Sequence, residues 1–334
     1  MTQLNSPPRV SIGIPVYNGS QFLPDALEAL LAQTFTDFEI LISDNASTDD
    51  TEAISRRYAA QDQRIRYERL AINEGAVNNF NRLVALSQGE YFKWAAADDV
   101  CLPQFLETLV TVLDQRPDIA WCHCCTVKID GAGRRLDAND PASEGLADTT
   151  QAGMPRMDHA AESPAQRFRG VLLGTSWCAD SYGLFRREIL TQTALFPQCY
   201  GAEKVMLGEM ALRGKYFEVP KILFLQRVHG QASGNFETSQ KQRKYVLGNK
   251  RVGWASFDRL RLLIAHCRSV RRTPLTWQQR VWSYLYIMQY VCQFRKWRYT
   301  ISTLLTGRSM KGARVGKAEV QSKEHQTLPQ SENR

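Results

Sequence analysis

The chain has 334 residues, of which 43% are hydrophobic and 23% are charged. These fractions are typical of globular proteins and exclude a disordered, collagen-like or low-complexity chain over most of the length. The formal net charge is +8 but is unevenly distributed: residues 1–240 carry 22 basic and 30 acidic side chains, whereas residues 241–334 carry 20 and 4. An acidic body followed by a strongly basic segment indicates an anionic partner for the basic part.

The chain shows no targeting or membrane-spanning pattern. Its N-terminal residues are polar, so we expect no secretory signal, and no run of 18 uncharged apolar residues predicts a spanning helix. Without such a signal, the simplest expectation for the eight cysteines is reduced thiols in the cytoplasm. The run 121–125 (WCHCC) suggests a metal motif, but no second Cys/His pair follows at zinc-site spacing. We therefore interpret it as a buried strand.

Hydrophobic patterning predicts alternating strands and helices over the first 130 residues. Short β-rich runs predict strands at 10–14, 38–42, 65–68, 91–95 and 119–127. Helical spacing of apolar residues predicts helices at 22–31, 47–60, 77–86 and 103–116. Ser47 and Asp50 have the spacing of a capping box for the second helix. This alternation predicts an α/β fold with a mainly parallel, Rossmann-like sheet flanked by helices.

The remainder of the chain has a different organisation. Residues 131–165 are rich in Gly, Ala, Asp, Pro and Ser, which predicts a long loop over a ligand site at the strand ends. Further elements are predicted at 165–173, 182–185, 202–213, 216–219 and 222–226. From residue 236 onward, helical patterns rich in Arg and aromatic residues follow. We therefore predict an α/β domain at 1–235, a basic helical extension at 236–308 and a disordered tail at 309–334.

Polar residues follow each of the first four predicted strands, where parallel sheets bind ligands. These residues are Pro15 to Gly19, Asp44 to Ser47, Asn73 to Gly75, and Asp98 with Asp99. The adjacent carboxylates of Asp98 and Asp99 are hard oxygen ligands, which suit Mg²⁺ or Mn²⁺ together with substrate phosphates. The alternative for this pair is a polar turn before the next helix. For Asp44 the alternative is capping of the following helix, and for the other two segments it is an ordinary loop.

Taken together, these segments resemble the motifs of family 2 glycosyltransferases, which have the GT-A fold. The matching segments, in order and at the right spacing, are Pro15-Val16-Tyr17-Asn18, Ser43 to Asp49, Asn73-x-Gly75, and Ala97-Asp98-Asp99 at the place of the metal-binding D-x-D element. The resemblance covers roughly residues 9–232. It implies an inverting transferase that uses a nucleotide-sugar donor and a divalent metal, Mn²⁺ or Mg²⁺.

The resemblance also implies roles for individual residues. Nucleotide-sugar contacts would come from Pro15, Tyr17, Asn18, Asp44, Asn73, Gly75 and Asp98. Among these, Asp44 would contact the nucleobase, and Asp98 would hold the ribose or help to place the metal. Asp99 would be the main metal ligand. His229 could approach the metal or the diphosphate, the alternative being a strand-end histidine without a ligand. Many relatives have an Asp where this chain has Ala96, so coordination would rest on fewer carboxylates.

An inverting transferase needs a general base that deprotonates the acceptor hydroxyl. In the family this base is a carboxylate before a helix near the end of the catalytic domain, a place that Glu203 occupies here. Related sequences often have Asp at this place. Glu209 is the alternative base, although it could be an ordinary solvent-facing helical residue. Asp180 is a weaker third choice.

The basic stretch 259–308 interleaves aromatic residues with Arg and Lys. We predict peripheral contact with an anionic membrane through this stretch. A nucleic acid is the less favoured partner, because no recognised nucleic-acid-binding motif is present. Packed helices with a basic outer face are a further alternative.

The resemblance thus implies an inverting glycosyltransferase that transfers a sugar to a glycan or glycolipid hydroxyl. The expected role is bacterial surface polysaccharide or lipopolysaccharide synthesis, in the cytoplasm at the inner face of the cell membrane. One alternative is a non-catalytic, membrane-associated scaffold that binds a nucleotide. Another is a nucleotidyltransferase, against which the lack of a Gly-rich loop after the first strand argues.

Overall fold

The computed structural model describes residues 7–136, 161–174, 179–199, 201–230 and 258–292. Its strands are β1 (Val10–Val16), β2 (Phe38–Asp44), β3 (Ile65–Arg69), β4 (Tyr91–Trp94), β5 (Val100–Cys101), β6 (Ile119–Ile129), β7 (Leu184–Arg186) and β8 (Lys215–Arg227). They form one sheet in the order β3-β2-β1-β4-β7-β6-β8-β5. The predicted loop at 131–165 lies largely outside the described residues, and the predicted tail at 309–334 lies entirely outside them.

The sheet is parallel through β3, β2, β1 and β4, and β7 then runs antiparallel to both of its neighbours. Beyond β7, β8 pairs in parallel with β6 and antiparallel with the short β5. The predicted α/β class is therefore confirmed. The sequence pattern did not predict β5, whose two residues are too few for a periodicity. It also predicted two strands where β8 is continuous, because Pro220 interrupts the apolar pattern without ending the strand.

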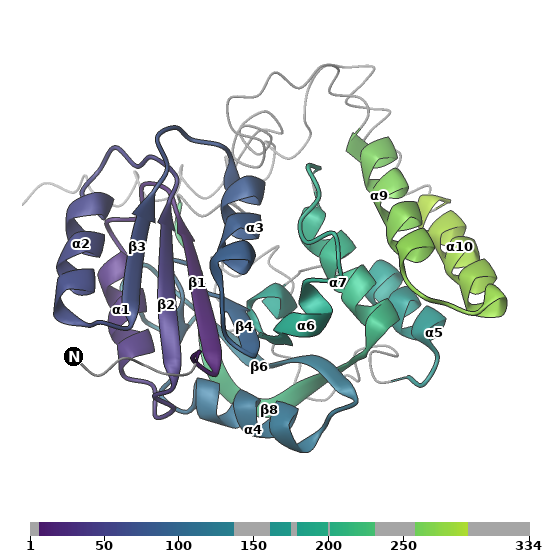
Figure 1. The fold of residues 1–334 in the computed structure, drawn as a ribbon, viewed down its shortest axis with the longest axis horizontal. Coiled ribbons are helices and arrows are strands. Elements are labelled where there is room, and N and C mark those ends of the chain that lie inside the picture. Colours follow the sequence, from purple (N-terminus) through teal and green to yellow (C-terminus); the bar gives the residue numbers. More distant parts are fainter. Residues whose placement is uncertain (1–6, 137–160, 175–178, 200, 231–257, 293–334) are drawn as a thin grey trace, which may run out of the picture.

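Helices cover both faces of the sheet (Figure 1). They are α1 (Leu23–Leu31), α2 (Thr51–Gln61), α3 (Ala76–Leu86), α4 (Phe105–Gln115), α5 (Pro164–Arg169), α6 (Arg187–Leu190), α7 (Ala202–Arg213), α9 (Asp258–Arg272) and α10 (Trp277–Val291). Helices α1, α2 and α4 pack on one face, and α3, α6 and α7 pack on the other. None of the described helices is both long and apolar enough to cross a bilayer.

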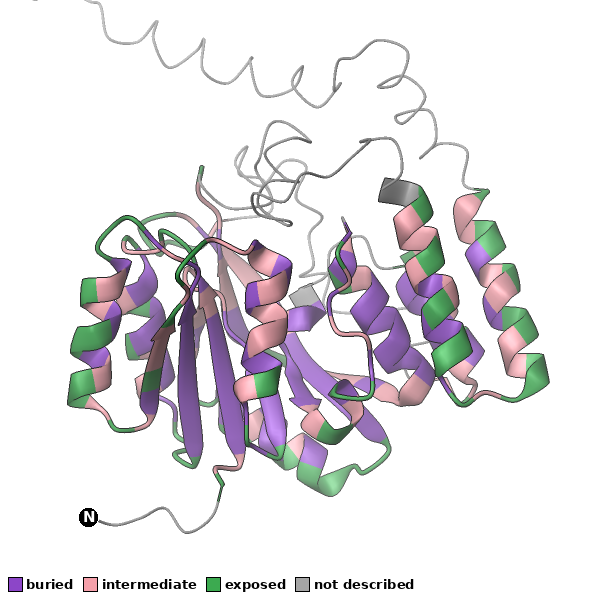
Figure 2. Ribbon diagram, turned by 45° about the horizontal axis from the view of Figure 1, so that its top comes forward, coloured by how far each residue is buried: buried purple, intermediate pink, exposed green. Residues whose placement is uncertain are grey.

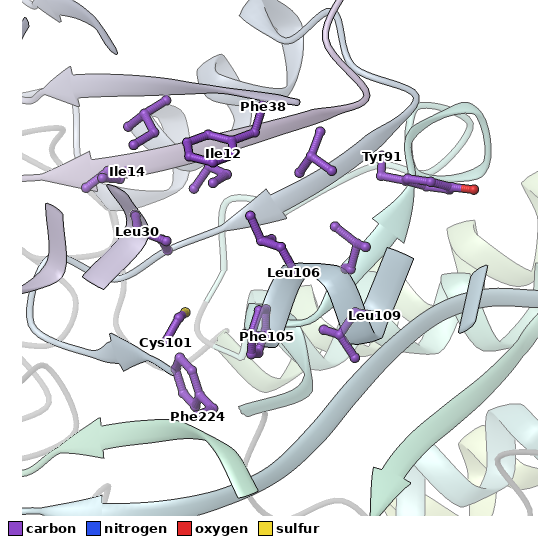
Figure 3. Packing of buried hydrophobic residues seen from close by; sticks show 14 of the residues in the cluster. Ile12, Ile14, Leu30, Phe38, Tyr91, Cys101, Phe105, Leu106, Leu109 and Phe224 are labelled. Atoms are coloured by element: carbon purple, nitrogen blue, oxygen red, sulfur yellow. The ribbon is translucent and has the colours of Figure 1, made fainter. Parts of the chain in front are cut away.

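The core under α1 and α4 is built from buried aliphatic and aromatic side chains (Figure 3). Ile12 and Ile14 of β1 meet Leu30 of α1, while Phe105 and Leu106 of α4 fill the adjoining space. This burial explains the continuous apolar runs of the central strands, which are covered on both faces. The run 121–125 lies in β6 and is buried except for a partly exposed Cys125, in agreement with its interpretation as a strand.

The predicted capping box of the second helix is wrong. Helix α2 begins only at Thr51, and Asp50 at the N-cap position makes no side-chain capping bond. Instead, Asp49 Oδ1 accepts a hydrogen bond of 3.1 Å from the Thr51 backbone N–H. Ser47 is engaged elsewhere, because its hydroxyl accepts a hydrogen bond from Asn18 across the neighbouring loop.

The two C-terminal helices pack beside α5 and α7 (Figure 2). Their contact is a third core cluster, in which Phe168, Leu172 and Leu212 meet Val270 of α9 and Ile287 of α10. Helix α10 begins with a capping box: the Thr276 hydroxyl accepts from the Gln279 N–H, and the Gln279 side chain accepts from the Thr276 N–H.

Candidate active site

The loops after β1 and β2 are joined by side-chain hydrogen bonds at the carboxyl edge of the sheet, the upper edge in Figure 1. The Asn18 backbone N–H donates to Ser47 Oγ over 2.9 Å, and Asn18 Oδ1 accepts from the Thr48 N–H over 2.8 Å. Asn18 has a φ of 52°, a left-handed conformation that Asn tolerates better than most residues. The local sequence therefore fixes this turn through both the backbone and the side chain of one residue.

The loop after β3 is joined to the same edge through two asparagines. Asn45 Nδ2 donates to Asn73 Oδ1 over 3.1 Å, and Asn45 Oδ1 accepts from the Glu74 N–H over 2.9 Å. Asn73 Oδ1 also accepts from the Gly75 N–H over 2.9 Å. Gly75 has a φ of 87°, which requires glycine. The structure thus brings together the first three predicted segments.

Asp44 lies at the end of β2 and is fully buried. Its Oδ1 accepts from the Ser47 N–H over 2.8 Å, and its Oδ2 accepts from the Tyr67 hydroxyl over 2.8 Å. Arg69 Nε lies 3.5 Å from the same Oδ2. Burial, together with the bond to Asp44, raises the pKa of the Tyr67 phenol well above its usual value. Because Asp44 has no exposed surface, the geometry gives it a role in holding the loop after β2 rather than in direct contact with a nucleobase.

The turn after β4 is clamped to the end of β8. Asp99 Oδ1 accepts from the Arg227 backbone N–H over 2.9 Å, and Arg227 Nε donates to the Asp98 carbonyl over 2.9 Å. Two residues further on, His229 Nε2 lies 2.9 Å from Asp98 Oδ2. Asp98 and His229, which the sequence analysis treated separately, therefore form one pair.

Asp98 and Asp99 differ sharply in their surroundings. The Asp98 side chain is 29% exposed, whereas Asp99 is only 8% exposed. Burial, and secondly the charge of Asp98, raises the pKa of the Asp99 carboxyl well above its usual value. The geometry therefore favours Asp98 over Asp99 as the carboxylate that a ligand can reach.

Arg227 connects this turn to α1. Its Nη2 lies 3.0 Å from Asp25 Oδ2, and its guanidinium carbon lies 4.7 Å from the centre of the Phe22 ring. The Phe22 ring in turn lies 4.6 Å from the His229 ring, centre to centre. Sequence reasoning missed Phe22 and Asp25 because nothing near them in the chain indicates a partner about 200 residues away.

Sequence reasoning also missed Lys93, whose ammonium is fully buried next to the acidic turn. Its Nζ donates to the carbonyls of Tyr182 over 2.7 Å and of Trp94 over 3.1 Å, and lies 4.4 Å from the Phe105 ring centre. Its charge opposes the rise in the pKa of Asp99. A lysine inside the apolar strand β4 was the feature that could have revealed it, since a buried lysine needs specific partners.

The 2.9 Å between Asp98 Oδ2 and His229 Nε2 is the distance of a hydrogen bond between the two side chains. A carboxylate oxygen and an imidazole nitrogen are also atom types that bind divalent ions such as Mn²⁺, so this pair offers two ligands for such an ion. Among the described residues, no group of three or more His, Cys, Asp or Glu side chains gathers around a common centre. Because Ala96 provides no carboxylate, the remaining ligands would come from substrate phosphates and water.

Glu203 lies in the first turn of α7, after Gly201 with its left-handed φ of 79°. This end of α7 points toward the same upper edge in Figure 1 as the carboxyl ends of β1–β3. The side chain keeps an exposed surface, yet the surrounding protein desolvates the carboxyl and raises its pKa. A raised pKa is the property expected of a general base that works near neutral pH.

The alternative base, Glu209, is not solvent-facing but fully buried. Its Oε1 lies 3.2 Å from Arg213 Nη2, and its Oε2 accepts from the Ser269 hydroxyl over 2.9 Å. These contacts join α7 to α9, so the geometry gives Glu209 a structural role. Asp180 is likewise buried, and it accepts a 2.9 Å hydrogen bond from the Tyr216 hydroxyl. Of the three carboxylates considered as bases, only Glu203 is exposed.

Comparison with known proteins shows similarity to glycosyltransferases. Over 121 residues the chain is 35% identical to YibD, an uncharacterized glycosyltransferase of Escherichia coli, a match that covers 36% of this chain and 35% of YibD. It is 34% identical over 118 residues to an uncharacterized glycosyltransferase of Rickettsia prowazekii, covering 34% and 36% of the two chains. The matched region thus spans about a third of the length of each relative.

Two solved structures share the fold. One is TarS 1–349 of S. aureus in complex with UDP-GlcNAc, with a TM-score of 0.61, 14% identity, and coverage of 90% of this chain and 76% of that one. The other is the mannosyltransferase PcManGT of Pyrobaculum calidifontis in complex with GDP-Man and Mn²⁺, with a TM-score of 0.51, 14% identity, and coverage of 95% and 81%. Residues 11–191, more than half of the chain, match the family model described as glycosyl transferase family 2. The chain belongs to this family.

Proposed function

We propose that the protein is an inverting glycosyltransferase that uses a nucleotide-sugar donor. The observation that carries the proposal is the pairing of Asp98 with His229 at the carboxyl edge of the sheet, beside the joined loops that contain Asn18, Asp44 and Asn73. Family membership and the donors bound to the two structural neighbours support it.

The donor would lie across the carboxyl edge of the sheet. Asp44, which is fully buried and accepts from the Ser47 N–H and the Tyr67 hydroxyl, would hold the loop that faces the nucleobase. Pro15, Tyr17, Asn18, Asn73 and Gly75 would form the wall beside the nucleoside. Because these loops are already held by hydrogen bonds, little ordering would be needed when the donor binds.

A divalent ion, Mn²⁺ or Mg²⁺, would be held by Asp98 and His229, and it would supply Lewis-acid stabilisation of the departing diphosphate. Asp99 would hold the turn through its bond to the Arg227 N–H. Arg227 would in turn keep the end of β8, and with it His229, in place. The mannosyltransferase neighbour, which carries Mn²⁺ with its nucleotide sugar, supports a divalent ion at this place.

Glu203 would act as the general base in a single in-line displacement. Its carboxylate takes the proton from the acceptor hydroxyl while that oxygen forms a bond to the anomeric carbon. The bond from the anomeric carbon to the phosphate oxygen breaks, and its electron pair leaves with the nucleoside diphosphate. The configuration at the anomeric carbon is inverted.

The acceptor would be a hydroxyl of a glycan or a lipid-linked glycan, in bacterial surface polysaccharide or lipopolysaccharide synthesis. The protein would work in the cytoplasm, in peripheral contact with the inner face of the cell membrane through 259–308. The basic, aromatic composition of this stretch supports such contact.

A thermal-shift panel of nucleoside diphosphates and nucleotide sugars, with and without Mn²⁺, tests the donor site. We expect one nucleotide to raise the melting temperature in a Mn²⁺-dependent manner by mass action, and Asp98→Asn to remove this shift. Glu203→Gln should keep it, because the base does not touch the donor nucleotide. If folded protein shows no shift with any nucleotide, the donor site is wrong. If a bound nucleotide sugar is never turned over with any acceptor glycan, the scaffold alternative is favoured.

A further inference from the structure

Helix α10 exposes a row of large apolar side chains to solvent. Its members, each between 48% and 73% exposed, are Trp277, Val281, Trp282, Leu285 and Met288. Their spacing places them along one side of the helix. We call this row the α10 stripe. Single exposed apolar residues are common, but a contiguous row of this size marks a surface that contacts another body.

The opposite side of α10 is already occupied by the protein. Ser283 and Ile287 are buried there, and Ile287 belongs to the core cluster with Phe168 and Val270. The outward side of α10 nevertheless carries large apolar side chains that the described residues leave uncovered (Figure 2). Such a surface is a candidate for contact with another body.

The two helices are predominantly basic: the described residues 259–292 contain six Arg and no Lys, Asp or Glu. Arg268 and Arg271 are exposed on α9, which packs against α10. Arg280, on α10 itself, donates to the carbonyls of Arg271 and Thr273 at the turn between the two helices. Apolar side chains flanked by arginines are complementary to a surface with negative headgroups over an apolar interior.

We propose that the α10 stripe docks into the interface of an anionic lipid bilayer, with the arginines of α9 and α10 on the headgroups. A second copy of this chain fits less well, because it would bring two strongly basic segments together. A nucleic acid fits less well because the centre of the surface is apolar, whereas nucleic acids are bound mainly through contacts to phosphates.

The same two helices also hold the turn that carries Glu203. A methyl group on Gly201 would lie 3.6 Å from Leu262 of α9, which shows how closely α9 approaches this turn. Lys204 Nζ donates to the Leu172 carbonyl over 3.3 Å and lies 5.4 Å from the ring centre of Tyr290 in α10. Docking would therefore place the end of α7 with Glu203 near the bilayer. The acceptor would then be lipid-borne, a conclusion that rests on the proposed function.

Vesicle flotation of the full chain tests the docking surface. Phosphatidylcholine vesicles with and without phosphatidylglycerol are compared, at low and at high salt. We expect wild-type protein to float with the anionic vesicles and to be released by salt. The double variant Trp282→Ser/Leu285→Ser should lose about tenfold or more in vesicle affinity, because it removes two apolar side chains that would enter the bilayer. Arg268→Glu/Arg271→Glu should lose a comparable amount at low salt.

The matched control is Ile72→Ser/Ile222→Ser, which removes two exposed apolar side chains outside α9 and α10 and should float like wild type. Unchanged flotation of the Trp282→Ser/Leu285→Ser variant would overturn the proposal, as would equal binding to neutral vesicles. Sedimentation equilibrium without lipid is the second measurement, and a dimer that this variant abolishes would assign the α10 stripe to a second copy. The thermal shift with nucleotide and Mn²⁺ should be the same in this variant as in wild type. Failure of docking is thereby separated from failure of the donor site.

Discussion

Asp98 Oδ2 and His229 Nε2 lie 2.9 Å apart although 131 residues separate them in the chain. The contact exists because β8 runs alongside β6 and ends next to the turn that follows β4, where the Arg227 N–H binds Asp99. A strand from the second half of the chain thus completes a site that the first half begins.

Asp99 supports the turn, so substitutions at Asp99 should act on stability more than on ligand binding. Asp99→Asn keeps an acceptor for the Arg227 N–H and resembles the neutral carboxyl that burial favours. We expect it to retain Mn²⁺-dependent nucleotide binding and to change the free energy of unfolding by less than about 1 kcal/mol. Asp99→Ala leaves a buried N–H without its acceptor and should cost about 1–3 kcal/mol. Urea denaturation of both variants measures the difference, and loss of nucleotide binding in a folded Asp99→Asn protein would contradict the assignment.

Glu203→Gln should lower turnover by about 10²–10⁴-fold and leave donor affinity unchanged, because it removes only the proton acceptor. The raised pKa of Glu203 has a second consequence. The base works only when deprotonated, so kcat/KM of the wild type should fall as the pH drops through a value above that of an ordinary glutamate. The residual kcat/KM of the Glu203→Gln variant should not show this decrease at low pH.

A suitable control for Glu203→Gln is Glu107→Gln, on α4 at the other face of the sheet, which should leave turnover and its pH profile unchanged. If the variant at position 203 keeps wild-type turnover, the base is a different residue.

Glu209 should be a stability residue. Its carboxylate is fully buried between Arg213 and Ser269 and also accepts from the Ala194 N–H over 3.2 Å. Glu209→Ala leaves these groups without their partner, and breaking such a buried pair costs about 3–5 kcal/mol. Arg272→Ala is the contrast, because Arg272 is 40% exposed and lies 3.8 Å from the same carboxylate. It should cost less than about 1 kcal/mol, and equal losses in urea denaturation would refute this account.

His266 should make the protein sensitive to acid. Its ring is fully buried between Phe168 and Tyr290 with both nitrogens unpartnered, and desolvation, followed by the charge of Lys204, lowers its pKa to about 3. Between this value and the pKa of about 6.5 in the unfolded chain, only the unfolded state binds the proton. Stability should therefore decrease as the pH falls through this window, by about 1.4 kcal/mol per pH unit from this one group.

His266→Leu checks the effect, because it keeps an apolar side chain of similar size and cannot titrate. Urea denaturation at pH 7 and at pH 5 should show a loss for wild type that exceeds the loss for the variant by about 2 kcal/mol. An equal loss of stability in wild type and variant between pH 7 and pH 5 would show that this histidine is not protonated on unfolding.

The sequence was sufficient for the alternating part of the fold because each element there carries its own periodicity. The strand at Val10 and the helix at Ala202 were predicted with correct starts for this reason. The motif residues after the strands were found because a parallel sheet brings the carboxyl ends of its strands to one edge. The alternation of strands and helices along the sequence is therefore enough to predict which residues lie at the same edge of the sheet.

The partners of those residues could not be predicted in the same way. Both Asp98 and Asp99 were visible as acids, but their unequal exposure depends on the Arg227 N–H, which a strand far along the chain supplies. Glu209 has the sequence context of an ordinary helical glutamate, and only the docking of α9 buries it. The sequence does not explain why a lysine lies in the apolar strand β4. The structure does, because Lys93 Nζ donates to two backbone carbonyls.

The cluster that joins Phe168 and Leu212 to Val270 and Ile287 limits where the protein can be truncated. A chain ended at residue 235 would leave Phe168 and Leu212 facing water and Glu209 without Ser269. Such a fragment would expose an apolar surface next to an uncompensated charge, which favours aggregation over folding. The transferase half and its C-terminal helices should therefore melt in one transition, and shortened versions of the protein should be recovered mainly as insoluble material.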